Sequence, residues 1–207
     1  MYSNLHNLVY AFHGCDMDTY NRVLHCHESL MPSCNPYDWL GNGIYFLENS
    51  LSRAEAWARE HCERYNKNNP DKTPKKPAVI GAIIDLGHCL NLTDYSSLDM
   101  LTLGYEILSD ECSSNNKSLP NNIDIEGNND LLIRKLDCAV IQRIHQFNEV
   151  NNFRGYDSVR GVFVEGEPVY ANSGIMSKTH IQICVVNPNC IKGYFKPLIS
   201  NKEWNAV

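Results

Sequence analysis

The stretch from Trp39 to Glu48 constrains the fold most, because it joins a tight turn, a strand and a helix start within a few residues. The turn is Gly41-Asn42-Gly43, and both residue types tolerate the positive φ angles that tight turns require. The apolar run 44–47 that follows is typical of a short buried strand. Asn49 or Ser50 is then suited to cap a helix in which apolar residues recur at helical spacing.

This turn, strand and helix unit should present one aromatic ring, Tyr45 or Phe46, at the edge of a cleft. Aromatic residues in strands usually pack in the core, but such a ring can also stack on a flat ligand. Successive side chains of a strand point to opposite faces. If Tyr45 faces the cleft, Phe46 therefore takes the core position.

Composition indicates one globular domain covering residues 1–207. The net charge of −6 argues against a protein that coats nucleic acid through bulk charge. No apolar run is long enough to span a membrane, and the first residues lack the pattern of a secretion signal. The nine cysteines are odd in number and form no CxxC pair, which favours reduced thiols and a cytoplasmic location.

Strand-like runs lie near both ends of the chain, with helix-like runs between them. The expected strands cover 8–14, 44–47, 78–86, 159–166, 180–186 and 190–195. The expected helices cover about 51–65, 96–111 and 130–150, and Asp16 or Asp18 is placed to cap a shorter one. This order predicts an α+β fold and not a regular βαβ alternation.

Two common classes of site find little support in the sequence. No GxGxxG or GxxxxGK[ST] motif follows an expected strand, which argues against the usual dinucleotide-binding and P-loop folds. Candidate metal ligands occur at His25-Cys26-His27, Cys34, His61-Cys62 and His88-Cys89. Among the adjacent ligands only His25 and His27 have a spacing close to that of a structural zinc site, so no metal is expected.

Three positions are candidates for chemistry. His13-Gly14 ends the first strand and can offer a ring nitrogen and an unobstructed backbone, although a strand-end histidine is often purely structural. Tyr45 is the second position. Gln182 is the third, on a strand otherwise filled by apolar residues, where it either is hydrogen-bonded in the core or lines a site.

Taken together, these segments resemble the diphtheria-toxin-like ADP-ribosyltransferase superfamily, in the H-Y-E branch that includes the poly(ADP-ribose) polymerases. The resemblance rests on His13-Gly14, on the Gly-Asn-Gly-Ile-Tyr-Phe string at 41–46, and on Gln-Ile-Cys-Val-Val-Asn-Pro at 182–188. It covers roughly a third of the chain, and the helical region 87–158 matches nothing in the family. The family fold implies two small antiparallel sheets packed around a cleft that holds NAD in a bent shape.

The resemblance implies roles for individual residues. His13 would bond the adenosine-side ribose, and the backbone of Gly14 would hold the nicotinamide amide. Tyr45 would stack on the nicotinamide ring, with Ser52 as a further contact at that end. Tyr170, in the loop before the late strand, is another candidate contact to NAD.

The chain departs from the family at its third position, where Gln182 replaces a catalytic glutamate. A carboxylate there stabilises the oxocarbenium-like transition state and activates an acceptor, whereas glutamine supplies neither charge nor base. Polymer elongation is therefore not expected. Glu165 or Glu167 in the preceding loop is a candidate for the missing carboxylate, and both also fit exposed turn residues. Arg160 is suited to meet a phosphate or to pair with Asp157.

The predicted function is a mono-ADP-ribosyltransferase that cleaves the nicotinamide–ribose bond of NAD. It would transfer ADP-ribose to a macromolecular acceptor, a protein or a nucleic acid. By analogy, its role would be that of an intracellular toxin or phage-defence effector, a toxin having an antitoxin as partner. One alternative is an NAD glycohydrolase, with water as acceptor. The other is a catalytically degenerate module that binds NAD or ADP-ribose, a reading that Gln182 favours.

Overall fold

The computed structural model describes residues 8–124 and 131–198 and confirms a mixed α+β fold. The elements are β1 (Leu8–Asp16), α1 (Met17–His25), β2 (Ile44–Glu48), α2 (Leu51–Asn68), β3 (Pro77–Asp85), β4 (Cys89–Asn91), α3 (Leu98–Ser114), β5 (Asn122–Ile123), β6 (Ile133–Arg134), α4 (Lys135–Val150), β7 (Ser158–Phe163), β8 (His180–Val185) and β9 (Ile191–Phe195). One-turn 3₁₀ helices, Tyr95–Ser97 and Pro188–Cys190, precede α3 and β9.

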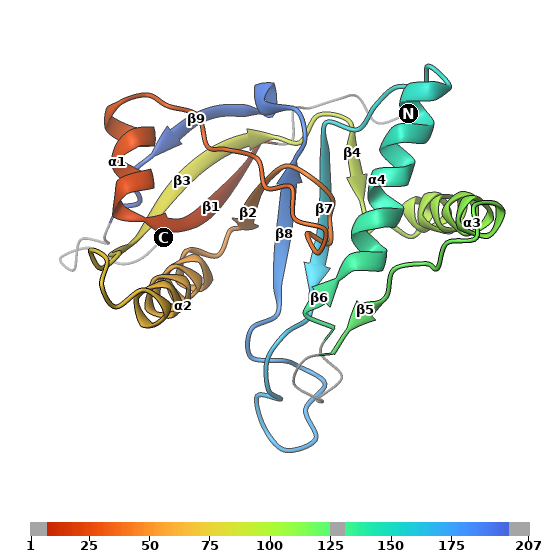
Figure 1. Ribbon diagram of the computed structural model, residues 1–207. Coiled ribbons are helices and arrows are strands. Elements are labelled where there is room, and N and C mark those ends of the chain that lie inside the picture. The colour runs from red at the N-terminus through yellow and green to blue at the C-terminus, as the bar shows by residue number, and fades with distance from the viewer. Residues whose placement is uncertain (1–7, 125–130, 199–207) are drawn as a thin grey trace.

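Seven of the described strands form one continuous sheet in the order β4-β7-β8-β2-β1-β3-β9 (Figure 1). All neighbours are antiparallel except β4 and β7. β5 and β6 form a separate two-stranded ladder. The expected pair of small packed antiparallel sheets is therefore replaced by one mixed sheet, because β2 is hydrogen-bonded to both β1 and β8 and so joins the two halves.

β2 and β8 carry two cores, one on each side. Ile44, Phe46, Ile183 and Val185 belong to the first core, together with residues of β1, β3 and α1. Alternate positions, among them Cys184, belong to the second core with residues of α4 and β7. Burial on both sides explains why these strands are almost continuously apolar in sequence.

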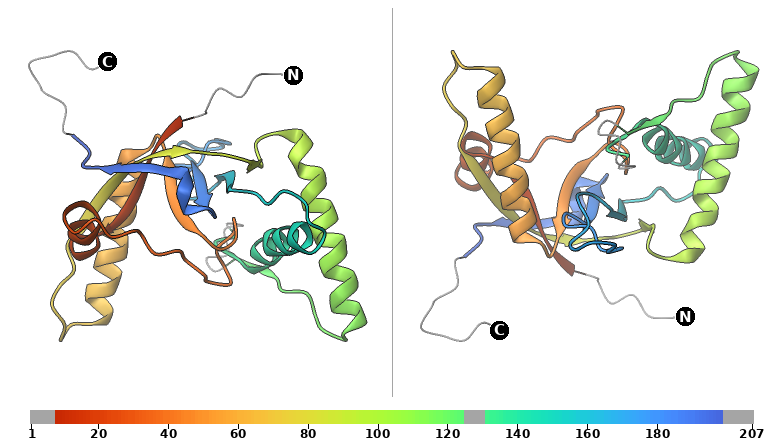
Figure 2. Two further views of the ribbon diagram at one scale, coloured as in Figure 1. Left: turned by 90° about the horizontal axis from the view of Figure 1, so that it is seen from above. Right: turned by 90° about the horizontal axis from the view of Figure 1, so that it is seen from below.

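The helices lie at the two ends of the sheet. α1 and α2 lie on opposite sides of the β1–β3 region, whereas α4 packs on the β7 end and α3 packs on α4 (Figure 1). Figure 2 shows α2 and α3 at opposite ends of the molecule. The region 87–158, which has no counterpart in the resembled family, thus supplies the helices that cover one half of the sheet.

Local sequence signals located most elements. Asp16 is the N-cap of α1 and accepts a hydrogen bond from the Thr19 amide at 2.8 Å. Gly41 has a φ of 84°, as the turn prediction required. Ser50 precedes α2, although its side chain makes no cap hydrogen bond. The helix expected over 130–150 begins only at Lys135, because Ile133–Arg134 form β6; Asp130 itself lies outside the described residues.

Candidate functional site

The three positions singled out in the sequence fall on three adjacent strands. His13 is on β1, Tyr45 on β2 and Gln182 on β8, and β2 lies between the other two. In the β2–β8 ladder Leu47 is opposite Gln182, and Tyr45 is opposite Cys184. Tyr45 and Gln182 are therefore diagonal neighbours on one side of the sheet.

The ladder between β1 and β2 is short. β1 pairs with β3 along all nine of its residues, but in the described structure it pairs with β2 only at Ala11–Glu48 and Phe12–Leu47. We call the stretch beyond these two pairs, His13 to Asp16 on β1 facing Ile44 to Phe46 on β2, the β1–β2 opening. Main-chain groups that face it lie outside the β1–β2 ladder, and most of the flanking residues, among them Gly14, Ile44 and Phe46, are buried.

His13 spans the β1–β2 opening at its closed end. Its Nδ1–H donates a hydrogen bond to the Tyr45 carbonyl at 2.8 Å, and its ring lies 5.8 Å from that of Phe46 in an edge-to-face contact. Burial lowers the pKa of His13, an effect only partly offset by the Tyr45 carbonyl. The histidine is therefore a neutral donor at neutral pH.

Gly14 is required by helix packing. A Cβ at this position would lie 2.6 Å from the Ala54 carbonyl oxygen and 3.1 Å from Cε3 of Trp57, so α2 approaches β1 closely here. Trp57 is still 41% exposed and stacks on His61 with a ring separation of 4.9 Å. The accessible indole of Trp57, beside Gly14, is a second flat surface near the β1–β2 opening. From the sequence, Trp57 is expected among the apolar residues that recur at helical spacing in this helix.

Tyr45 is fixed at both ends. Its hydroxyl donates to the Gly41 carbonyl at 2.8 Å and accepts from the Leu40 amide at 3.0 Å. The ring packs against the second core, and burial raises its pKa well above the ordinary tyrosine value. Phe46 is 1% exposed and takes the expected core position on the other side. The side chain of Tyr45 thus anchors the turn that precedes its own strand.

Gln182 belongs to a series of hydrogen bonds in which the donor and the acceptor of each bond are determined. Trp39 Nε1–H donates to Gln182 Oε1 at 2.7 Å, and Gln182 Nε2 donates to His180 Nε2 at 2.8 Å. His180 Nδ1–H donates to the Lys178 carbonyl at 2.6 Å. His180 is therefore neutral, and burial lowers its pKa. Of the two roles left open for Gln182, the structure shows the hydrogen-bonded one.

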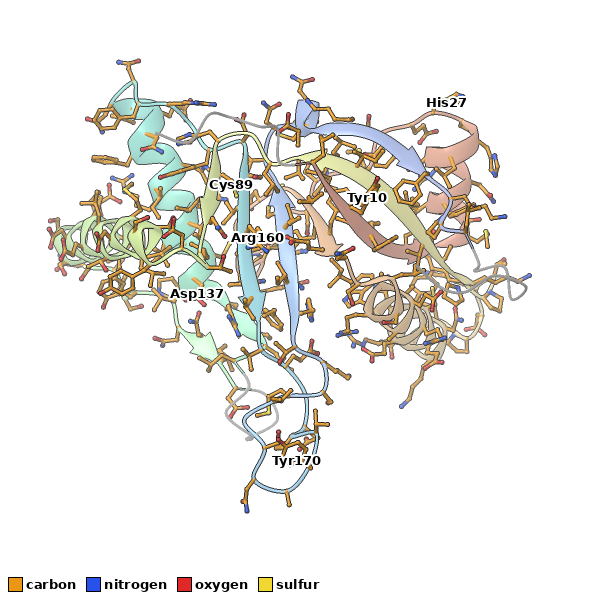
Figure 3. The ribbon with its side chains drawn as sticks, turned by 180° about the vertical axis from the view of Figure 1, so that it is seen from behind. Tyr10, His27, Cys89, Asp137, Arg160 and Tyr170 are labelled. Carbon is orange, nitrogen blue, oxygen red and sulfur yellow. The ribbon has the colours of Figure 1, made fainter. Side chains whose placement is uncertain are left out.

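The remaining predicted site residues differ in how closely they approach this region. Glu165 lies at the base of the loop between β7 and β8, and its Oε2 is 2.9 Å from an Arg53 nitrogen. Glu167, Tyr170 and Ser52 are exposed. Tyr170 lies in the projecting part of the loop, away from the sheet that carries Arg160 (Figure 3). The structure thus brings Glu165, but not Glu167 or Tyr170, toward the Gln182 strand.

Arg160 pairs with Glu48 and not with Asp157, the carboxylate expected from the sequence. Its guanidinium forms a bidentate pair with Glu48 of β2 and also donates to Asn91 and Thr93. Asp157 instead accepts from the His88 amide and the Asn187 side chain, and these bonds lower its pKa. Four of the five N–H donors of Arg160 are thus used within the protein, and the bidentate pair with Glu48 links β7 to β2.

Two hollows of the described structure lie beside α1 and not at Tyr45 or Gln182. An open hollow of about 500 Å³ is lined by Asp16, Thr19, Arg22 and Lys75, beside α1. Asp16 is hydrogen-bonded there to Lys75, which helps to lower its pKa to about 2. Within residues 8–124 and 131–198, no three His, Cys, Asp or Glu side chains gather as metal ligands, and all nine cysteines are free thiols.

Four residues of this region were not identified as site candidates from the sequence: Trp39, Arg53, Trp57 and His180. His180 could have been found, because strand alternation places it on the same side as Gln182. Trp39 and Arg53 could not, because they meet their partners only through tertiary contacts. Trp39 and His180 bond the Gln182 amide directly, and Arg53 bonds Glu165 at the base of the neighbouring loop.

Comparisons with known proteins add one relative. No family model matches the chain, and no solved structure matches it significantly. The chain is 25% identical over 197 residues to the uncharacterized protein MJ0359 of Methanocaldococcus jannaschii, covering 87% of this chain and 83% of that protein. The identity is low but the coverage is nearly complete on both sides, so the likeness concerns the whole chain and not one motif.

Proposed function

We propose that this protein is an NAD-dependent mono-ADP-ribosyltransferase, which cleaves the nicotinamide–ribose bond and transfers ADP-ribose to a macromolecular acceptor. The observation that carries the proposal is that His13, Tyr45 and Gln182 lie on the adjacent strands β1, β2 and β8, with Tyr45 and Gln182 on one side of the sheet and His13 on the other. These residues lie far apart in sequence, and the strand order brings them to the same part of the sheet, which supports a shared site.

The groups around the β1–β2 opening suit the nicotinamide end of NAD. Tyr45 is the proposed stacking ring, although it packs against the second core, and Trp57 is a second aromatic ring that is 41% exposed. The single N–H of the neutral His13 ring is donated to the Tyr45 carbonyl, so a ligand has to displace that bond to use it. Gly14 has no side chain and lies in close contact with α2. A carboxylate for the developing positive charge has to come from outside β8, because Gln182 carries none.

NAD labelled on its adenylate side, incubated with the protein in a cell lysate, tests the proposal. Label on a protein or nucleic acid is the expected result, and Tyr45→Ala should abolish it by removing a stacking surface. Free labelled ADP-ribose alone would indicate the glycohydrolase, with water as acceptor. No consumption of NAD under these conditions would contradict both enzyme functions. A thermal melt of each variant separates lost chemistry from lost folding.

One observation favours the second candidate, a degenerate module that binds NAD or ADP-ribose without cleaving it. Both ends of the Gln182 amide are engaged, by Trp39 and by His180, so this side chain is organised as structure. Calorimetry with NAD and with ADP-ribose would show binding without turnover in that case. The proposed setting is the cytoplasm, with an antitoxin if the protein is a toxin. Within the described part of the chain, no helix is long and apolar enough to cross a membrane.

A further inference from the structure

Four side chains of alternating charge connect α2 to the loop between β7 and β8. Glu165 lies 2.9 Å from Arg53, Arg53 lies 4.0 Å from Glu60, and Glu60 lies 3.0 Å from Lys178. The Lys178 amide also donates to the Glu165 carbonyl at 3.0 Å, which closes the base of the loop. The loop is therefore tied to α2 at the point where it enters β8.

Burial separates an inner pair from an outer pair. The side chains of Arg53 and Glu165 are 10% and 19% exposed, whereas those of Glu60 and Lys178 are 39% and 42% exposed. Solvent screens the outer pair, so it contributes little to fixing the loop. A charge-assisted hydrogen bond in a mostly buried place determines geometry far more strongly. Arg53 is thus the residue that sets the position of the Glu165 carboxylate.

Arg53 uses only part of its donor capacity for this contact. Its NH2 nitrogen bonds Glu165 Oε2, while Nε and NH1 are buried without a hydrogen-bond partner among the described residues. Buried guanidinium N–H groups without a hydrogen-bond acceptor cost free energy, so this arrangement stabilises the fold poorly. On Glu165, Oε1 has no hydrogen bond within the described structure. The carboxylate therefore keeps one oxygen for another group.

The inner pair lies next to the Gln182 chain. Lys178 joins the two by its backbone, because its amide donates to the Glu165 carbonyl at 3.0 Å and its carbonyl accepts from His180 Nδ1–H. The positive charge of Arg53 lowers the pKa of the His180 ring and the negative charge of Glu165 raises it. The His180 ring also contacts the Gln182 amide and the Phe163 ring, and the Arg134 guanidinium lies over the Phe163 ring, 4.3 Å from its centroid. Glu165 is accordingly an acidic group near the Gln182 end of the site, whereas Glu167 is exposed farther along the loop.

We propose that Arg53 is a positioning residue, which holds Glu165 beside Gln182 so that a loop carboxylate does the work of the missing strand glutamate. This inference rests on the proposed function. In the reaction, the bond between ribose C1′ and the nicotinamide nitrogen breaks, and its electron pair leaves with nicotinamide. A bond forms from C1′ to an acceptor oxygen, whose proton passes to the free Oε1 of Glu165. The carboxylate also stabilises the positive charge on the ribose while neither bond is complete.

Steady-state kinetics with NAD test the chemical role. Glu165→Gln should lower kcat by about 100-fold or more and leave KM for NAD within about twofold, because the carboxylate acts on the transition state. Arg53→Lys keeps the charge but loses the planar fork, and should lower kcat by about tenfold. Glu55→Gln, an exposed acid on the same helix, is the matched control and should change neither constant. Wild-type kcat in Glu165→Gln would overturn the proposal.

Nuclear magnetic resonance titration of His180 tests the geometry without relying on turnover. Glu165→Gln should lower the pKa of this imidazole further, and Arg53→Gln should raise it, whereas Glu55→Gln should leave it unchanged. An unmoved His180 in both variants would place the inner pair elsewhere and refute the inference. A wild-type protein that neither binds nor cleaves NAD would overturn the proposed function instead, and the titration would still decide whether Arg53 and Glu165 flank His180.

Discussion

Replacing Gln182 by glutamate should make the stability of the protein depend on pH with a predictable sign. In the wild-type protein the bond between these two side chains has a donor and an acceptor, because Gln182 donates to the bare Nε2 of a neutral His180. A carboxylate at position 182 would point an oxygen lone pair at the lone pair of Nε2. The folded Gln182→Glu protein therefore has to keep a proton between the two groups, on either the ring or the carboxyl.

The magnitude follows from proton linkage. In the unfolded chain His180 loses its proton near its ordinary pKa of about 6.5. In the folded variant the shared proton is retained to higher pH, so the folded state binds more protons and stability falls as pH rises. The slope approaches about 1.4 kcal/mol per pH unit, or about 2 kcal/mol between pH 6.5 and pH 8. For a chain of this size that is about 4–8 °C in Tm.

The wild-type contribution of His180 has the opposite sign. Burial lowers the pKa of this ring in the folded state, so its contribution to stability is present above about pH 6.5 and is lost as pH falls through that range. Urea unfolding of wild type and Gln182→Glu at pH 6.5 and at pH 8 measures the difference directly. Gln182→Met is the control, since it removes the same hydrogen bonds without adding an ionisable group. A difference between wild type and Gln182→Glu that stays constant across this range would refute the reasoning.

Three further substitutions have outcomes that chemical unfolding can measure. Tyr45→Phe should lower the free energy of unfolding by about 1–3 kcal/mol, because its two backbone partners lose their bonds, while NAD binding through the ring persists. Gly14→Ala should cost about 1–3 kcal/mol, because the new Cβ would meet the Ala54 carbonyl at 2.6 Å; wild-type stability would contradict that contact. Arg160→Met should cost about 3–5 kcal/mol by leaving Glu48 unpaired, with KM for NAD unchanged; a higher KM and intact stability would favour a phosphate role.

The features that sequence predicted well are those with local causes. Asp16 caps α1 through a hydrogen bond to the third residue after it, and this pattern is readable in any chain. The long apolar runs form β1, β3 and β8. Such a run identifies a buried strand from the sequence alone, even when the strand it pairs with is not known. β4 and the β5–β6 ladder, with three residues or fewer per strand, are too short to show periodicity.

The features that sequence missed depend on partners far away along the chain. Trp39 and Gln182 are 143 residues apart, and Arg160 and Glu48 are 112 apart. Arg160 was assigned to Asp157 or to a phosphate because nothing local shows that β7 and β2 both border β8. The sequence does not predict the single mixed sheet for the same reason. It identifies the long strands, but it does not show that β2 pairs with β1 on one edge and with β8 on the other.

The proposed function requires one ligand to contact residues on opposite sides of the sheet. The His13 ring lies on the side of Phe46 and the first core, whereas Tyr45 lies on the side of the second core. In an unbroken ladder the backbone would separate them. Because the β1–β2 pairing ends after Phe12, no ladder of backbone hydrogen bonds separates the two sides of the sheet there. The bond from His13 to the Tyr45 carbonyl spans the gap. Under the proposed function, a ligand that touches both rings has to displace the bond from His13 to the Tyr45 carbonyl.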